Sequence, residues 1–181
     1  DKAHDLLQAL ASKHRLIIVT PDGDPFGWYV DSRIEPGAKI QTFIVAELLP
    51  VLEKTLPLNG SRGIAGISMG GNGALVLGVK HPRLFRSVSS MSGAVDLSEA
   101  SSRAALIARL GPYDDHRRTW EANSALHLAQ NSKHLEQLAL LLSVGAEDRW
   151  AAANRRLDHL LSSRGVPHRY IERAGKHDWP H

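Results

Sequence analysis

Apolar residues recur along the chain with helical and strand-like spacing in turn, which predicts alternating helices and strands. Residues 4–13 place their leucines on one helical face, and the β-branched run 15–19, ended by the turn sequence PDGD, predicts a buried strand. The apolar face of the first helix consists of Leu6, Leu7, Leu10 and Ala11. From residue 41 to 54 apolar positions recur every three or four residues, which predicts an amphipathic helix adjusted locally at Pro50.

The rest of the chain continues this alternation and predicts the fold class. Further strands are expected at residues 62–68, 85–93, 138–145 and 168–172. Helices are expected at residues 72–80 and 150–165, the second closed by Gly165. Strands joined by helices favour an α/β fold with a mostly parallel sheet and helices on both faces. The polar stretch 94–135 is expected to be an irregular insertion over one end of the sheet, within a single domain that covers residues 1–181.

Composition narrows the class of protein without pointing to a partner. The 181 residues include 43% hydrophobic and 23% charged residues, which excludes a disordered or fibrous chain. Lys and Arg number 22 against 19 Asp and Glu, with no concentrated basic stripe, so no nucleic-acid partner is expected. No stretch approaches the ~18 apolar residues of a membrane span. The absence of cysteine excludes disulfides, thiolate metal sites and a cysteine nucleophile, and it leaves the compartment open.

A glycine-rich turn between the strand 62–68 and the helix 72–80 carries the main chemical signal. Its sequence GISMG, residues 66–70, has the G-x-S-x-G pattern of a nucleophile elbow. Such a turn exposes the Ser68 hydroxyl at the carboxyl edge of the sheet and aims the Met69 N–H at the same space, where it can stabilise an oxyanion. The alternative is a phosphate loop or a plain tight turn, although the chain has no G-K-[ST] ending and no GxGxxG there.

A serine hydroxyl needs a general base, and the chain has ten histidines. His177 follows the last expected strand through the flexible segment 173–176, which places it at the ligand-binding edge of an open α/β sheet. The order serine, acid, histidine in such sheets also puts the base last, so His177 is the predicted base. Pro180 argues against a helix that would present both His177 and His181 as metal ligands, and no metal site is expected.

The acid of the triad should follow another strand between the serine and the histidine. Asp148 closes the run LLLSVGAED just past a strand, and it is the predicted acid that would fix the tautomer of His177. An N-cap on the following helix is the alternative role for Asp148. Asp96 also follows a strand and is its rival, whereas Glu147 and Asp178 are weaker candidates because their neighbours point elsewhere.

With these residues identified, the chain resembles the putative-esterase (esterase D-like) branch of the α/β-hydrolase superfamily. That branch includes S-formylglutathione hydrolases, feruloyl and acetylxylan esterases, and the mycolyltransferases. The resemblance covers nearly the whole chain and rests on motifs that occur in order: Gly27-Trp28-Tyr29-Val30-Asp31-Ser32, Thr42-Phe43-Ile44, Glu47-Leu48-Leu49-Pro50, Gly66-Ile67-Ser68-Met69-Gly70-Gly71, Gly73-Ala74, His81-Pro82 with Phe85, Ser92-Gly93, Gly145-Ala146-Glu147-Asp148 and Gly175-Lys176-His177-Asp178-Trp179. It implies that Ser68 is the nucleophile, Asp148 the acid and His177 the base. It also implies that the Met69 N–H is one oxyanion donor.

The chain departs from this family at its start. Members have further strands before the first helix, and a His-Gly type loop there supplies the second oxyanion donor. Because the chain begins at Asp1 without such strands, we expect an N-terminally incomplete domain. In the family's strand order the missing strand lies between segments 15–19 and 62–68, and buried strands tolerate unpaired backbone groups poorly. Hence the chain is longer, or the two strands pair directly, or another chain such as a second copy in a homo-oligomer fills the gap.

The predicted activity is hydrolysis of a carboxylic ester through an acyl-enzyme on Ser68, without a cofactor. The substrate would be a small-molecule or carbohydrate-linked ester. By the resemblance Trp28 and Tyr29 would line the site, with Trp120 from the insertion as a further lining residue; packing in the interior is the alternative for these aromatics. An acyltransferase with the same triad and a non-catalytic esterase-like binding protein are the alternative functions.

Overall fold

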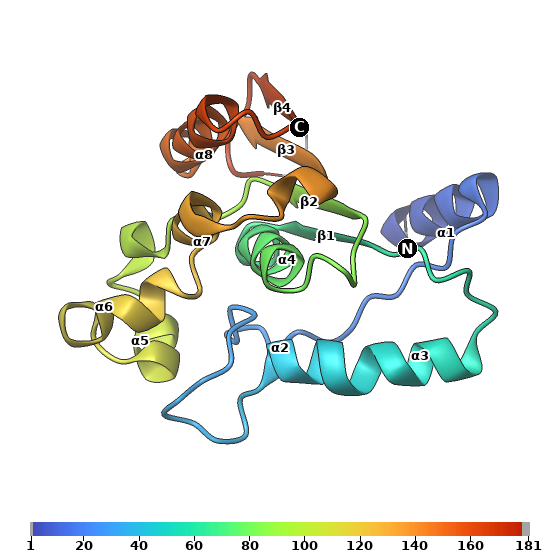
Figure 1. Ribbon diagram of the computed structural model, residues 1–181, viewed down its shortest axis with the longest axis horizontal. Helices are drawn as coiled ribbons and strands as arrows, with labels where there is room; N and C mark the ends of the chain where they lie inside the picture. The colour runs from blue at the N-terminus through green and yellow to red at the C-terminus, as the bar shows by residue number, and fades with distance from the viewer. Residues whose placement is uncertain (1, 179–181) are drawn as a thin grey trace.

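The computed structural model describes residues 2–178, in which helices pack on a parallel sheet in an α/β fold (Figure 1). Within these residues the sheet has the order β1-β2-β3-β4, and each strand pairs in parallel with the next. The strands are β1 (Gly63–Ile67), β2 (Ser87–Met91), β3 (Ala139–Gly145) and β4 (His168–Arg173). These are the strands expected from residue 62 onward, and their carboxyl ends meet at one edge of the sheet, so the loops that follow them share one rim.

One face of the sheet is covered by α4 (Met69–Lys80), α7 (Ala125–Asn131) and α8 (Ala151–Ser163). Apolar side chains of these helices form one core with alternate residues of β2 and β3, such as Val88, Leu140 and Leu142. The expected helices at 72–80 and 150–165 are therefore confirmed, and Gly165 follows α8 with a φ of 66° that favours glycine. The opposite face of the sheet stays partly exposed.

The helix expected over residues 41–54 is confirmed, together with an adjustment near its proline. The continuous helical run consists of α2 (Ile40–Thr42), the π-helical segment η1 (Phe43–Leu48) and α3 (Leu49–Thr55). The Leu49 N–H donates to the carbonyl of Ile44, five residues back. A proline ring clashes with the carbonyl four residues earlier in a regular α-helix, and the wider π turn before Pro50 accommodates it.

The prediction of a buried strand at residues 15–19 is wrong. This segment follows α1 (Lys2–His14) as irregular chain, and its apolar side chains from Leu16 to Val19 are 40–56% exposed. Among the described residues β1 pairs only with β2, so the segment and β1 do not pair directly. A short apolar run forms a strand only when a neighbouring strand pairs with its backbone, and none of the described residues provides that neighbour. The leucine face of α1 is likewise exposed, Leu6 by 60%.

Residues 94–135 are helical and not irregular, which corrects the expectation for this insertion. Besides α7 they form the 3₁₀ turns η2 (Leu97–Ala100) and η3 (Leu135–Gln137) and the helices α5 (Ala104–Leu110) and α6 (Tyr113–Glu121). α5 and α6 build a second core with Trp28 and Trp150, which come from distant parts of the chain. Helices this short are marginal alone and gain their stability from such packing, which the local sequence does not display.

Candidate active site

The turn between β1 and α4 holds Ser68 in a strained conformation. Its φ of 56° and ψ of −116° lie outside the regions that a side chain tolerates easily, at a cost of about 1–3 kcal/mol. The Ser68 N–H donates to the Met91 carbonyl at 2.9 Å and the Ser68 carbonyl accepts from the Ala94 N–H at 3.1 Å, which fixes the turn. A Cβ on Gly66 would overlap the backbone of Gly70, so this close approach requires glycine.

Ser68, His177 and Asp148 form one hydrogen-bonded chain. The Ser68 hydroxyl donates to His177 Nε2 at 2.9 Å, and His177 Nδ1–H donates to Asp148 Oδ2 at 2.8 Å. The serine follows β1, the aspartate follows β3 and the histidine follows β4, so the shared rim of the sheet brings them together. The structure thus assembles the three residues singled out in the sequence, although they are up to 109 positions apart.

The environment of Asp148 keeps its carboxylate ionised. Its side chain is fully buried, which favours the protonated form. Hydrogen bonds from the Trp150 N–H at 2.8 Å and from the side chains of His177 and Ser92 outweigh that burial, so the pKa of Asp148 lies below its ordinary value. Asp148 is not the N-cap of α8, which is Trp150; one of its carboxylate oxygens accepts the Trp150 N–H before the helix and the other faces His177.

The rival acids have other partners. Asp96 accepts from the Ser98 N–H at the start of η2 and pairs with Arg156 at 2.9 Å, away from His177. Glu147 accepts from the Gly175 N–H at 3.1 Å and thereby fastens the loop that carries His177. The Glu147 N–H also donates to the Gly175 carbonyl at 2.9 Å, so Glu147 holds this loop by two hydrogen bonds. The motif residue Trp179, Pro180 and the rejected metal ligand His181 lie outside the described residues.

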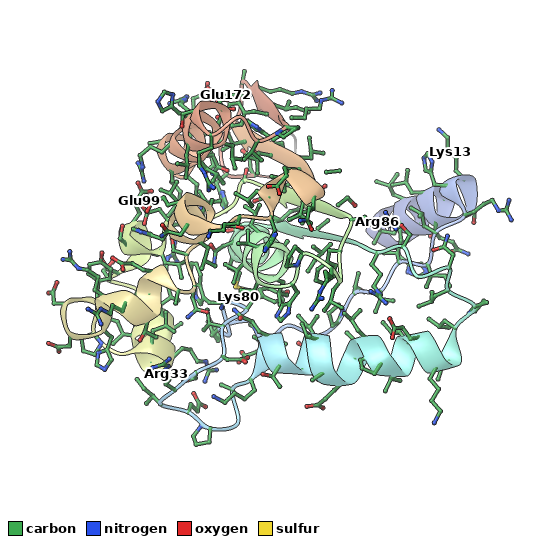
Figure 2. The ribbon with its side chains drawn as sticks, in the orientation of Figure 1. Lys13, Arg33, Lys80, Arg86, Glu99 and Glu172 are labelled. Atoms are coloured by element: carbon green, nitrogen blue, oxygen red, sulfur yellow. The ribbon has the colours of Figure 1, made fainter. Side chains whose placement is uncertain are left out.

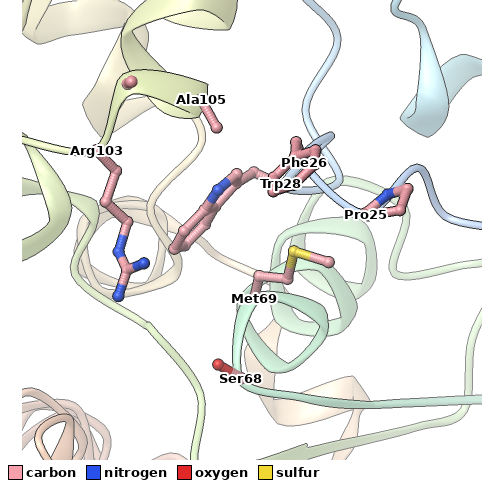
Figure 3. Close-up of a pocket in the computed structure, with 8 residues that line it drawn as sticks. Pro25, Phe26, Trp28, Ser68, Met69, Arg103 and Ala105 are labelled. Atoms are coloured by element: carbon pink, nitrogen blue, oxygen red, sulfur yellow. The ribbon is translucent and has the colours of Figure 1, made fainter.

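A pocket of about 420 Å³ opens beside Ser68 (Figure 3). It is lined by Pro25, Phe26, Trp28, Ser68, Met69, Arg103, Ala104 and Ala105. Met69 is the first residue of α4, where an N–H has no partner within its own helix, so the predicted oxyanion donor begins a helix at the pocket. The segment 94–135 contributes to this pocket through the start of α5.

The aromatic candidates occupy different places. Trp28 lines the pocket, as expected. The Tyr29 side chain instead packs against α4, where a Cβ on Gly73 would come within 2.6 Å of the Tyr29 Cβ and 2.8 Å of its ring. Trp120 is 1% exposed and donates its indole N–H to the Gly111 carbonyl at 3.0 Å, so it packs in the second core and does not line the pocket.

A buried polar network ties the segment that carries Trp28 to α4. The Gln41 side-chain amide donates to the Tyr29 carbonyl at 2.6 Å. Lys80, which lies at the end of α4 and is labelled in Figure 2, donates to Gln41 Oε1 at 2.9 Å. Burial lowers the pKa of Lys80, against the opposing effect of the nearby Asp31 carboxylate. Trp28 and Tyr29 both have a φ of 52°, and this network helps to hold them in that unfavourable conformation.

Several residues of the site were not predicted from the sequence, and three of them matter most for its chemistry. Phe26 and Arg103 line the pocket, and Ser92 is hydrogen-bonded to Asp148. Ser92 stands just past β2 with a φ of 47°, and the Ser92-Gly93 pair at a strand end was the available signal. Nothing local marks Phe26 or Arg103, because each reaches the pocket through long-range packing.

The described residues offer neither a metal site nor a bilayer-spanning segment. No group of three or more histidine, aspartate or glutamate side chains among residues 2–178 is arranged to hold a metal ion. Within the same residues no helix combines the length and hydrophobicity needed to span a bilayer.

Comparisons with known proteins show similarity to esterases over the whole or part of this chain. A family described as "Putative esterase" matches residues 2–181. An esterase of Mycobacterium tuberculosis is 40% identical over 97 residues, which are 50% of this chain and 21% of that protein. The mouse S-formylglutathione hydrolase is 26% identical over 163 residues, which are 78% of this chain and 56% of that enzyme. The chain thus spans little more than half of the mouse enzyme and about a fifth of the mycobacterial one.

Solved structures agree with the fold. The structure of a ferulic acid esterase superposes with a TM-score of 0.78 and 30% identity, over 97% of this chain and 70% of that one. An S-formylglutathione hydrolase from Staphylococcus aureus superposes with a TM-score of 0.76 at 21% identity. The parallel sheet and its covering helices are therefore those of an α/β-hydrolase-type esterase.

Proposed function

Because the chain belongs to the "Putative esterase" family, we propose that it hydrolyses carboxylic esters through an acyl-enzyme on Ser68. The observation that carries this proposal is the continuous hydrogen-bonded chain from Ser68 through His177 to Asp148. A structural cluster would not need a serine in a strained turn at the mouth of a pocket. The substrate is a small-molecule or carbohydrate-linked ester.

The proposed reaction proceeds in two halves. His177 Nε2 accepts the Ser68 proton as the oxygen attacks the ester carbonyl, and it then donates that proton to the leaving alcohol. In the second half water attacks the acyl-enzyme, with His177 again as the base, and the acid product leaves. Asp148 stays ionised throughout, since its role is to hold the histidine tautomer and stabilise the imidazolium.

Stabilisation of the tetrahedral oxyanion is assigned to the start of α4. The Met69 N–H follows Ser68 directly, and the amino end of a 12-residue helix carries partial positive charge. Removing one oxyanion donor typically costs about 10²–10³ in kcat. A second donor would therefore raise the rate substantially over that obtained with Met69 alone.

A fluorophosphonate probe followed by mass spectrometry tests the proposal. Ser68 should be labelled in the wild-type protein, and labelling should vanish in Ser68→Ala and fall sharply in His177→Ala. Ser61→Ala removes an exposed hydroxyl outside the site and is the matched control, which should label normally. An unlabelled wild-type protein would favour the non-catalytic alternative.

Hydrolysis and acyl transfer share the first half of this mechanism, so product analysis must separate them. Turnover of an activated ester in the presence and absence of a sugar or glycerol acceptor gives the ratio of acid to new ester. A predominance of new ester would replace the hydrolase assignment by the acyltransferase one.

A further inference from the structure

Arg103 is the one charged side chain among the eight residues that line the pocket beside Ser68. Apart from this guanidinium and the Ser68 hydroxyl, the lining consists of proline, aromatic, methionine and alanine side chains. Arg103 is exposed at this pocket, so its guanidinium is accessible to a ligand group of opposite sign whose apolar part lies in the pocket.

The guanidinium of Arg103 is held by two aromatic rings. Its Cζ lies 5.4 Å from the centroid of the Trp28 ring and 5.8 Å from that of the Trp150 ring, within the range of cation–π contacts. Both rings are buried, at 6% and 4% exposed, so they form a fixed support. Figure 3 shows the guanidinium beside the Trp28 ring in the pocket that also contains Ser68.

The charge of Arg103 is not neutralised by the protein. Among residues 2–178 no carboxylate forms an ion pair with it. Arg109 on the same helix pairs with Asp24 and Glu35, and Arg156 on α8 pairs with Asp96 and Glu99. Because no residue within 2–178 accepts a hydrogen bond from its side-chain N–H groups, Arg103 can offer two of them to one carboxylate.

From this arrangement we propose that Arg103 selects esters that carry a carboxylate group, an inference that rests on the proposed ester hydrolysis. The apolar part of such a substrate would lie against Trp28 and the exposed ring of Phe26, with its ester carbonyl at Ser68. One positive charge matches one carboxylate, whereas a phosphate dianion would remain half unpaired in this lining. Arg103 acts on binding and specificity, and the chemistry stays with Ser68 and His177.

The test compares each charged ester with its neutral methyl ester in the same protein. One pair is the mono-4-nitrophenyl ester of adipic acid and its methyl ester, which differ on the acyl side. The other is 4-acetoxybenzoate and its methyl ester, which differ on the alcohol side. The ratio of kcat/KM within a pair is the readout, because changes in folding or in the triad cancel in it.

In the wild-type protein at least one pair should favour the carboxylate about five- to tenfold, mainly through KM, as a ground-state contact predicts. The preference should fall to about one in Arg103→Gln, reverse in Arg103→Glu, survive in part in Arg103→Lys, and weaken with added salt. Arg117→Gln is the matched control, since Arg117 lies 5.4 Å from the Tyr113 ring outside the pocket and its loss should leave the ratio unchanged.

Two results would overturn this inference. Either the wild-type ratio is near one in both pairs, or Arg103→Gln and Arg103→Glu keep the wild-type preference. Turnover of neither ester, with no labelling of Ser68, would instead refute the proposed function. The same preference can be measured from the rates at which a fluorophosphonate with a terminal carboxylate and its methyl ester label Ser68. This measurement does not depend on hydrolysis of an acyl-enzyme.

Discussion

Replacing Asp148 by asparagine tests the triad most sharply, because the structure dictates how the new amide must orient. Asp148 Oδ1 accepts the Trp150 N–H at 2.8 Å, and Oδ2 accepts His177 Nδ1–H at 2.8 Å. The Ser92 hydroxyl also bonds to Asp148 but can turn to accept instead, so the Trp150 N–H and His177 Nδ1–H compete for the single acceptor oxygen of an asparagine. Leaving a buried backbone N–H without an acceptor costs about 1–3 kcal/mol, so the oxygen should stay with Trp150 and the NH₂ group should face the histidine.

That orientation reverses the histidine tautomer. The amide NH₂ donates to His177 Nδ1, which places the ring proton on Nε2, where it faces the Ser68 hydroxyl. A protonated Nε2 cannot accept the serine proton, and the same reversal in a serine protease lowers kcat by about 10⁴. We therefore expect Asp148→Asn to lose about 10³–10⁴ in kcat on a short 4-nitrophenyl ester, with little change in melting temperature because the side chain keeps its shape.

Asp96→Asn is the control for this experiment, since Asp96 pairs with Arg156 and does not contact His177. It should weaken that ion pair and leave kcat within about twofold, since neither Asp96 nor Arg156 contacts the chain from Ser68 through His177 to Asp148. Activity of Asp148→Asn within tenfold of wild type would refute the tautomer argument. A larger loss in Asp96→Asn than in Asp148→Asn would move the acid to the earlier strand.

The remaining predictions concern the elbow, one surface pair and one core residue. Gly66→Ala should abolish fluorophosphonate labelling and lower the melting temperature, because its Cβ would overlap the Gly70 backbone; normal labelling would show that the turn can open. Glu172, whose pKa is lowered to about 2 mainly by its hydrogen bond from Arg155, adds stability that is fully present above pH 4.5 and lost as the pH falls toward 2. The free energies of unfolding of the wild-type protein and of Glu172→Gln, measured with urea, should therefore converge at low pH. A difference between them that does not change with pH would contradict this. Trp120→Phe keeps a buried aromatic ring but leaves the Gly111 carbonyl without its donor. Calorimetry should therefore show a loss of about 1–3 kcal/mol in the free energy of unfolding, with unchanged labelling of Ser68.

The elbow could be predicted from sequence because its determinants are local. Gly66 is required by the close approach of strand and helix, because a Cβ there would overlap the Gly70 backbone, and Ser68 follows two residues later. Asp148 and His177 were predictable for a related reason, since each lies a few residues past the end of a strand and parallel strands end at one rim. Their contact with each other then follows from the adjacency of β3 and β4.

The wrong predictions concern segments whose structure depends on distant parts of the chain. The run 15–19 has the composition of a strand, but a strand is a relation between segments, and none of the described residues supplies its neighbour. The helices of residues 94–135 depend on tryptophans from elsewhere in the chain for their apolar contacts. Arg103 joins the pocket by the same route, because its place is set by Trp28 and Trp150, 75 and 47 positions away in the sequence. Pattern reasoning therefore fails where a residue's environment is assembled from distant segments.

Both the sheet and the loops that follow its strands position His177 relative to Asp148 and Ser68. The register of β3 and β4 sets Gly145 opposite Arg173, so the segments that carry the acid and the base leave the sheet at the same level. Three further bonds then join these segments, from the Ala146 N–H to the Arg173 carbonyl at 2.7 Å and between Glu147 and Gly175 in both directions. The histidine thus extends from a loop that is braced against the loop of its own acid. A loop held this way can present the imidazole to Ser68 although residue 177 is in neither a helix nor a strand. The proposed mechanism requires accurate placement of this imidazole, and the hydrogen bonds between the two loops provide it.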